Sequence, residues 1–319
     1  MSAMRERWRR WVVRVRRHLG WARREGVGRL IEEDQLDPRQ RRRMSAARRA
    51  WVDAHPGVAP AARPVFLLGV QRSGTNMLVR GFETSPAFDV ANENDARAFV
   101  RFRLRPLDEV RAFIESDPHG HVLLKPLAES HRALELLAIG TPSPPVAIWA
   151  WRDVDDRVRS AVSKFGPNNL LTIQAIVRGE TRSISVEGPS QEMIELVRSG
   201  LSQDAMAFLE SLDLDELDAE AGAAAFWYVR NLAYFDLGLD RREDVALVSY
   251  DRMVRDPEDT MRALCRTVDV AFDPALVAHI ERRGATDRPT LRLPSAIRTA
   301  CDELTARLRS ARDPGIAAT

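Results

Sequence analysis

Residues 65–78 read VFLLGVQRSGTNML, and they carry the strongest structural signal in the chain. An unbroken apolar run typical of a buried strand meets a glycine-containing turn, and a helical pattern of apolar residues follows. Gly69 and Gly74 have the G-x-x-x-x-G spacing of a loop that cradles a phosphate. We therefore expect a strand, a tight turn and a helix, in that order.

The turn predicts an anion site of a particular kind. A Walker A nucleotide-binding loop needs a lysine at the position where this chain has Thr75. We expect the anion to be held by the N–H groups of residues 73–76 and by the helix dipole, with Arg72 supplying the charge. A nucleotide phosphate fits such a site better than a magnesium-bridged triphosphate. The alternative is a plain strand-to-helix turn in which glycine only relieves strain.

Length and composition allow one sizeable α/β core. The chain has 319 residues, of which 45% are hydrophobic, and two smaller domains are an alternative at this length. Cys265 and Cys301 have no C-x-x-C partner, so we expect neither a disulfide framework nor a zinc site. The sequence contains no apolar run long enough to span a bilayer and no recognisable secretory signal, which predicts a cytoplasmic protein.

Positive charge is unevenly distributed along the chain. The formal net charge is +2, whereas residues 1–25 alone contain nine arginines and two glutamates. Apolar residues recur there at helical spacing, which predicts a basic amphipathic helix. This helix can lie on an anionic membrane surface, peripheral to the inner membrane, or pack on the protein body or a second subunit. Since 46 of the 48 basic residues are arginine, Lys125 and Lys164 are candidates for sites that need a compact ammonium.

Strand and helix patterns alternate in the body of the chain. Five short apolar runs are separated by longer helical patterns, and the runs cover residues 65–70, 88–91, 121–125, 146–151 and 245–250. Such alternation predicts βαβ units and an α/β fold with a mostly parallel central sheet flanked by helices.

The same patterns suggest how the chain is divided. We expect a basic helical extension over residues 1–60, with a second arginine-rich helix near residues 38–54. An α/β domain should occupy residues 61–310, followed by a flexible tail over residues 311–319. Within the domain, residues 166–230 lack comparable strands and carry the acidic run SLDLDELDAEAG, so we expect a helical insertion that caps the site.

A second anion-binding pattern lies in residues 146–166. An apolar strand, VAIWAW, ends at Arg152, and the helix after it has Asp153 as its predicted cap. Ser160 follows Arg152 at a spacing that lets a strand-end guanidinium and a helix-borne hydroxyl converge on one anion. A salt-bridged helix start with a surface serine would produce the same pattern.

The glycine-containing turn resembles the 5′-phosphosulfate loop of sulfotransferases that use 3′-phosphoadenosine 5′-phosphosulfate (PAPS). The positions that match the loop are Arg72, Ser73, Gly74, Thr75 and Asn76. Asn76 replaces the commoner second threonine, and its side chain can still donate to a phosphate oxygen.

Two further segments are similar to the same family. Arg152 and Ser160 match the family's 3′-phosphate segment, and Tyr250 in VSYDRMVRDP matches a tyrosine that lies near the adenine. A strand-end tyrosine is also a common packing residue. The resemblance runs from about residue 65 to residue 270, is of the bacterial type, and implies the P-loop-like sulfotransferase fold.

The resemblance also implies catalytic residues. Glu93 follows the second strand and is similar to the family's general base, with Asp95 as a nearby competitor and a helix-capping turn as the structural alternative. Lys125 ends the third strand, where the family has a lysine that bridges donor and acceptor and stabilises developing charge. Some cytosolic relatives use a histidine two residues after this lysine, and this chain has Leu127 there.

The implied reaction is the in-line transfer of a sulfuryl group from PAPS to a hydroxyl of an acceptor, with adenosine 3′,5′-bisphosphate as product. The acceptor is a small molecule, a carbohydrate or a lipid; no metal and no nucleic-acid partner are expected. The chain lacks an F-R-K-G-type segment, so Arg282, Arg283 or Arg288 is expected to complete the 3′-phosphate site.

Two alternatives stay open. The first is a P-loop kinase or another nucleotide phosphotransferase, against which Thr75 and the lack of a Walker B aspartate after VAIWAW both count. The second is a non-catalytic, membrane-associated nucleotide-binding protein in which the basic N-terminal helix is the functional element.

Overall fold

The computed structural model describes residues 38–57, 61–100, 102–180, 190–282, 284 and 288–311. The basic helix predicted within residues 1–25 and the tail predicted beyond residue 311 lie outside these residues. The chain divides into a unit of residues 1–50 and a unit of residues 51–319. Helix α3 (Pro38–Ala54) coincides with the second arginine-rich helix that the sequence predicts.

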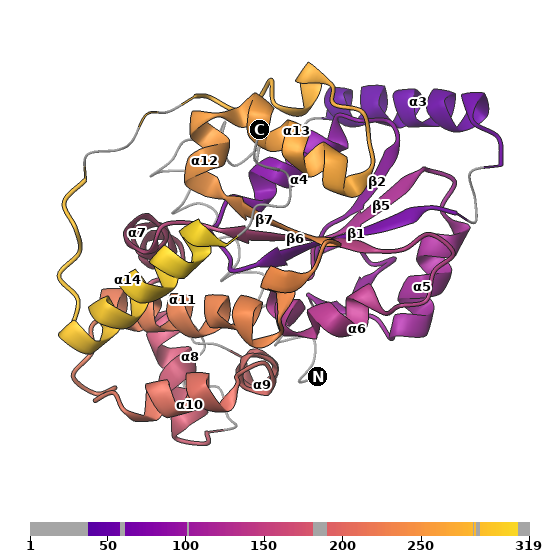
Figure 1. The fold of residues 1–319 in the computed structure, drawn as a ribbon. Helices are drawn as coiled ribbons and strands as arrows, with labels where there is room; N and C mark the ends of the chain where they lie inside the picture. The colour runs from indigo at the N-terminus through magenta and orange to yellow at the C-terminus, as the bar shows by residue number, and fades with distance from the viewer. Residues whose placement is uncertain are drawn as a thin grey trace. The chain divides into compact units, whose positions relative to one another are not determined.

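A five-stranded parallel sheet forms the centre of the second unit (Figure 1). Its order is β2-β5-β1-β6-β7, and every neighbouring pair is parallel. The strands are β1 (Arg63–Gly69), β2 (Phe88–Ala91), β5 (His121–Leu124), β6 (Val146–Trp151) and β7 (Val245–Ser249). The prediction of a mostly parallel sheet is confirmed, and the five strands lie close to the predicted runs.

The central strand β1 is apolar after Arg63, as suits a strand whose two faces are both covered. Successive side chains of a strand point to opposite faces, so Phe66 and Leu68 join one core cluster and Val65 and Leu67 join the other. Full burial of one such side chain stabilises the fold by about 1.5–3 kcal/mol. The apolar run of β1 therefore contributes side chains to the hydrophobic cores on both faces of the sheet.

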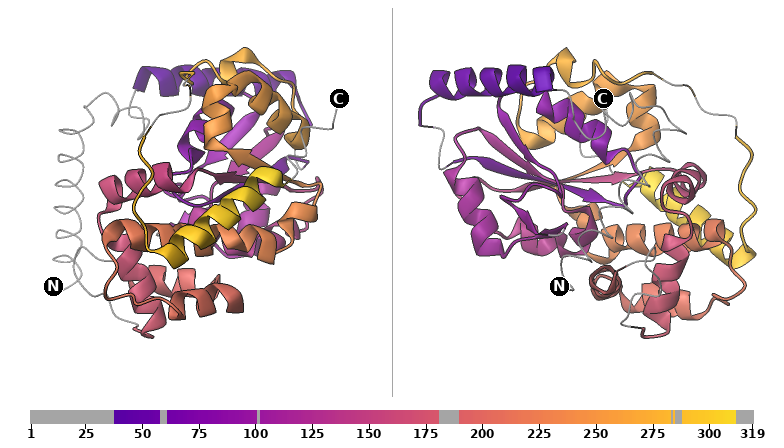
Figure 2. Two further views of the ribbon diagram at one scale, coloured as in Figure 1. Left: turned by 60° about the vertical axis from the view of Figure 1, so that its left-hand side comes forward. Right: turned by 180° about the vertical axis from the view of Figure 1, so that it is seen from behind.

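Helices cover both faces of the sheet (Figures 1 and 2). One layer contains α4 (Thr75–Glu83), α12 (Tyr250–Arg255) and α13 (Pro257–Val268), with the 3₁₀ turn η3 (Pro274–Leu276). The other layer contains α5 (Leu107–Ser116), α6 (Ala133–Leu137), α7 (Val154–Phe165), α11 (Ala219–Asp236) and α14 (Ser295–Ser310). The loops that leave the carboxyl ends of β1, β5 and β6 therefore open at one edge of the sheet, where α/β proteins bind ligands.

The segment between α7 and α11 is helical where the structure describes it. It contains α8 (Asn168–Val177), α9 (Gln191–Ser199) and α10 (Gln203–Glu210), which lie on the side of α11 away from the sheet (Figure 1). The acidic run SLDLDELDAEAG is largely a turn, and only its end enters a helix. Asp218 caps α11 by accepting a hydrogen bond from the Ala221 N–H at 2.8 Å, a role for which aspartate is well suited.

Several small elements were not predicted. They are the hairpin of β3 (Phe99–Val100) and β4 (Arg103–Leu104) and the 3₁₀ turns η1 (Leu127–Arg132), η2 (Leu239–Arg241) and η3. Two-residue strands are too short to show a periodic pattern. The Leu104 N–H donates to Glu129 Oε2 at 2.5 Å, which ties the hairpin to η1.

No helix within the described ranges combines the length and the apolar character that a membrane span requires. Cys265 in α13 and Cys301 in α14 are both buried and free.

Candidate active site

The turn between β1 and α4 (residues 70–74, the β1–α4 turn) depends on two glycines. Gly69 directly precedes it and Gly74 ends it. A Cβ atom on Gly69 would lie 2.1 Å from the carbonyl oxygen of Ala150, and one on Gly74 would lie 2.5 Å from Tyr250 Cδ2. Both glycines also have positive φ, 118° and 84°. Arg72 adopts φ 74° without being glycine, a conformation that costs about 1–2 kcal/mol. The turn is thus held in a strained, closely packed shape.

The start of helix α4 leaves its amide donors available. Gly74 is the N-cap residue and provides no side chain to cap the first turn. The neighbouring Ser73 hydroxyl is buried and finds no hydrogen-bond partner among the described residues. Uncapped amides at a helix N-terminus, with the positive end of the helix dipole, are a standard anion-binding arrangement.

The β1–α4 turn and helix α7 meet directly. Arg72 Nε donates to Ser160 Oγ at 3.0 Å, so residues from the two predicted anion-binding segments are in contact. The Arg152 guanidinium lies 4.1 Å from the centre of the Tyr250 ring. That ring in turn lies against Gly74. Contacts and the turn itself therefore link five of the predicted binding positions, namely Arg72, Gly74, Arg152, Ser160 and Tyr250.

The start of α7 is capped and strongly charged. Asp153 caps the helix as predicted, because its Oδ1 accepts from the Asp155 N–H at 3.1 Å. Asp156 then pairs with Arg152, Arg159 and Arg288 at 3.6, 3.7 and 3.5 Å.

The arginines expected to complete the 3′-phosphate site are separated in the structure. Arg288 lies beside Asp156, 3.5 Å away. Arg282 pairs with Glu258 at 3.4 Å, and Arg283 lies outside the described residues. Arg288 is therefore the one whose described contacts reach the start of α7.

Lys125 joins the β1–α4 turn to the next functional element. Its ammonium is buried, with 8% of the residue exposed, and donates to Asn76 Oδ1 at 2.7 Å. Lys125 begins the turn between β5 and η1 (residues 125–130, the β5–η1 turn). Glu93 lies within the electrostatic reach of this lysine.

The half-buried carboxyl of Glu93 is subject to opposing effects. Burial raises the pKa of Glu93 above its ordinary value, and the charge of Lys125 opposes that rise. The backbone N–H groups of Ala128 and Leu127 also hydrogen-bond the carboxylate and lower its pKa. Glu93 thus lies at the amino end of η1, close to the lysine that reaches Asn76.

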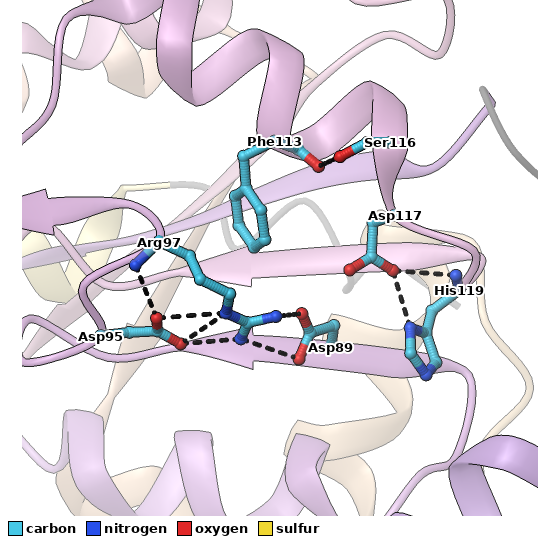
Figure 3. Close-up of polar contacts among 7 residues, drawn as sticks. All are labelled: Asp89, Asp95, Arg97, Phe113, Ser116, Asp117 and His119. Carbon is cyan, nitrogen blue, oxygen red and sulfur yellow. Dashed lines mark hydrogen bonds and ion pairs between the residues drawn. The ribbon is translucent and has the colours of Figure 1, made fainter.

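Asp95, the competing carboxylate, has a different environment (Figure 3). The Arg97 guanidinium bridges it to Asp89, with bonds of 2.7 Å to Asp95 Oδ2 and 2.5 Å to Asp89 Oδ2. The Phe113 ring packs over that guanidinium at 4.8 Å. Asp89, Arg97 and Asp95 therefore form a clamp that holds the segment after β2, and Glu93 lies in that segment.

A second acidic residue, Asp117, contacts the clamp through Asp89. Asp117 Oδ1 lies 2.7 Å from His119 Nδ1 (Figure 3). Burial raises the pKa of Asp117, and a hydrogen bond with Asp89 adds to the rise. Asp89 is thus enclosed between Arg97 and Asp117, which fixes the strand next to Glu93.

Sequence reasoning missed two buried arginines that support the turns. Arg157 of α7 donates from Nε to the Gln71 carbonyl at 3.2 Å. Arg230 of α11 donates from Nη2 to the Leu127 and Ala128 carbonyls at 2.9 and 3.3 Å. Burial lowers the pKa of these guanidinium groups to about 9 and about 10, so both stay charged at neutral pH. An arginine inside the otherwise apolar stretch AAAFWYVRNLAYF is a signal that could have identified Arg230.

Comparison with known proteins identifies the class. The sequence matches the profile of the Sulfotransferase family over residues 64–274, which is most of the chain. The protein therefore belongs to the sulfotransferase family, and the predicted P-loop-like sulfotransferase fold is confirmed. No curated protein sequence matches the chain.

Several solved structures are similar to it. The sulfotransferase domain of the Synechococcus PCC 7002 olefin synthase is 15% identical, with 80% of this chain and 97% of that chain covered and a TM-score of 0.42. A sulfotransferase from Alicyclobacillus acidocaldarius is 16% identical, covering 78% and 92%, with a TM-score of 0.38. A mouse sulfotransferase complexed with PAP is 12% identical, covering 81% and 90%, with a TM-score of 0.36.

Proposed function

We propose that the protein transfers a sulfuryl group from PAPS to a hydroxyl of a small-molecule, carbohydrate or lipid acceptor. The observation that carries this proposal is a set of buried donors without partners around one turn. Ser73 Oγ, Arg152 Nε and Arg157 Nη2 are all buried, and none has a hydrogen-bond partner among the described residues. Buried donors are nearly always paired, so three together indicate that an anion completes the site.

The donor fits this site through two separate contacts. The amides and hydroxyl of residues 73–76 would hold the 5′-phosphosulfate, and Arg72 would supply charge beside it. Arg152 and Ser160 would hold the 3′-phosphate, and Tyr250 would lie near the adenine. The 3.0 Å contact between Arg72 and Ser160 supports this assignment, because one nucleotide can reach both groups.

Catalysis would then use Glu93 and Lys125. Glu93 takes the proton of the acceptor hydroxyl as its oxygen attacks sulfur, and the bond between sulfur and the bridging phosphate oxygen breaks. The electron pair of that bond leaves with adenosine 3′,5′-bisphosphate, whose developing charge Lys125 stabilises. Within the described residues no cluster of side chains suited to a metal ion is found. Arginine, lysine and amide donors would neutralise the charge.

Calorimetric titration tests the proposal. We expect the protein to prefer adenosine 3′,5′-bisphosphate over ADP and ATP, and the preference should be the same in EDTA and in Mg²⁺. A magnesium-dependent preference for ATP would instead identify a kinase or another phosphotransferase.

A further inference from the structure

Arg157 is fully buried directly against the β1–α4 turn. Its exposed fraction is 0%, and Nε donates to the carbonyl oxygen of Gln71, the residue before Arg72. Nη1 donates to Asn169 Oδ1 and to the Ala223 carbonyl, each at 3.0 Å. The guanidinium is therefore fixed in place by α8, by α11 and by the turn itself.

The charge of Arg157 has no counter-charge in the described part of the chain. No carboxylate there pairs with it, and the charged groups that act on it are the two cations Arg72 and Arg230. Its Nη2 is buried and finds no hydrogen-bond partner among the described residues. A buried charge without a partner destabilises the folded state, so a residue whose only role is packing would be better served by an uncharged side chain.

The position of the charge suggests what compensates for it. The Gln71 carbonyl to which Arg157 is bonded lies in the turn whose amides are open to an anion. Electrostatic interactions inside a protein are stronger than in water, so a buried cation acts on an anion at this turn without touching it. The anion would also stabilise Arg72, because its negative charge offsets the repulsion between the Arg72 and Arg157 guanidinium groups.

We propose that Arg157 is a positioning residue of the β1–α4 turn, whose uncompensated buried charge strengthens the binding of the 5′-phosphosulfate at residues 73–76. This inference rests on the proposed function, since it assigns a support to the same donor site. A purely structural role would need the hydrogen bonds to Gln71, Asn169 and Ala223 and no charge.

Two ligands that differ by one phosphate separate these roles. Adenosine 3′,5′-bisphosphate occupies both anion sites, whereas adenosine 3′-monophosphate lacks the group that binds the β1–α4 turn. Calorimetry on the full chain gives the ratio of their dissociation constants. We expect Arg157→Gln to reduce the preference for the bisphosphate by about 10-fold to 100-fold, the range for a charge-assisted interaction. Affinity for the monophosphate should stay close to that of the native chain.

Two further variants serve as controls. Arg157→Lys keeps the charge and loses the planar fork, so it should restore most of the preference if charge is what matters. Arg230→Gln removes another buried arginine, which has no carboxylate partner among the described residues and binds the β5–η1 turn. It should leave the preference unchanged. Thermal unfolding of each variant shows whether it is folded.

The results decide between the two roles. An unchanged preference in Arg157→Gln, or equal losses in the Gln and Lys variants, would overturn the proposal, as would failure of both variants to fold. Inorganic phosphate separates this inference from the proposed function. If the native chain binds neither nucleotide but is stabilised by phosphate in an Arg157-dependent way, the donor assignment fails and the role of Arg157 stands. If it responds to none of the three, both fail.

Discussion

The β1–α4 turn and the β5–η1 turn have similar structures but differ in what their amide groups bind. Each follows a central parallel strand, begins a helical element and has a buried arginine bonded to its carbonyl groups, Arg157 in one and Arg230 in the other. The amides of the β5–η1 turn are directed to the protein's own carboxylate, Glu93. The amides at the end of the β1–α4 turn have no side-chain cap, and Ser73 beside them has a buried hydroxyl without a described partner.

Under the proposed function, this difference would let one edge of the sheet both hold an anion and activate a hydroxyl. A helix start that already binds a carboxylate has no capacity for another anion, and it fixes that carboxylate for proton transfer. A helix start without one attracts an anion from solution. Lys125 lies between the two and contacts Asn76 on one side. The following predictions test that division of roles, in decreasing order of the expected effect.

The largest effect is expected at Glu93. Glu93→Gln should lower kcat by about 10²–10⁴-fold, because the acceptor proton loses its base. The dissociation constant for adenosine 3′,5′-bisphosphate should change little, because the Glu93 carboxyl is held by amides of the β5–η1 turn and not by the β1–α4 turn. Asp95→Asn is the matched control and should retain more activity, since Asp95 pairs with Arg97. If Glu93→Gln were active and Asp95→Asn inactive, the general base would be Asp95 and not Glu93.

A smaller loss is expected from Lys125. Lys125→Met should lower kcat by about 10²–10³-fold, the effect of removing one donor that stabilises transition-state charge. Lys125→Arg keeps the charge in a bulkier, planar form and should recover part of the rate. Stopped-flow or steady-state kinetics with a hydroxyl acceptor would measure both variants. Full activity of Lys125→Met would remove this residue from the mechanism.

Arg230 should affect turnover more than donor binding. Its bond to the Leu127 carbonyl polarises the same peptide group whose N–H, that of Ala128, faces Glu93. Arg230→Gln should therefore lower kcat by about tenfold, the loss expected from a hydrogen bond to a charged group, and leave the bisphosphate affinity unchanged. Equal losses in both quantities would show that Arg230 supports the whole fold and has no separate effect at the β5–η1 turn.

The smallest effect is expected in the pH–rate profile, whose acid limb should lie at a higher pH than an ordinary glutamate would give. A general base works in its deprotonated form, and burial raises the pKa of Glu93 above its ordinary value. The rate should therefore fall as the pH is lowered through this raised pKa, and this limb should be absent from the residual activity of Glu93→Gln. A pH–rate profile of kcat/KM measures it. An acid limb at or below the ordinary glutamate value would contradict the buried environment.

The sequence predicted most of what lies along the strands and little of what supports them. Apolar runs identified the five strands, whereas the assignment of Arg152 and Ser160 to one anion came from their spacing together with the family resemblance. The roles assigned to these residues remain predictions. Arg157 and Arg230 escaped notice because their partners are distant in the sequence: Ala223 lies 66 residues after Arg157, and Leu127 lies 103 residues before Arg230. Such burial results from tertiary packing, which local periodicity does not encode.

A structure of the protein crystallised with adenosine 3′,5′-bisphosphate in the absence of divalent metal tests the central claim most directly. We predict the 5′-phosphate within hydrogen-bond distance of the residue 73–76 amides and the 3′-phosphate on Arg152 and Ser160. A nucleotide that reaches only one of these two groups, or that needs magnesium to bind, would contradict the account.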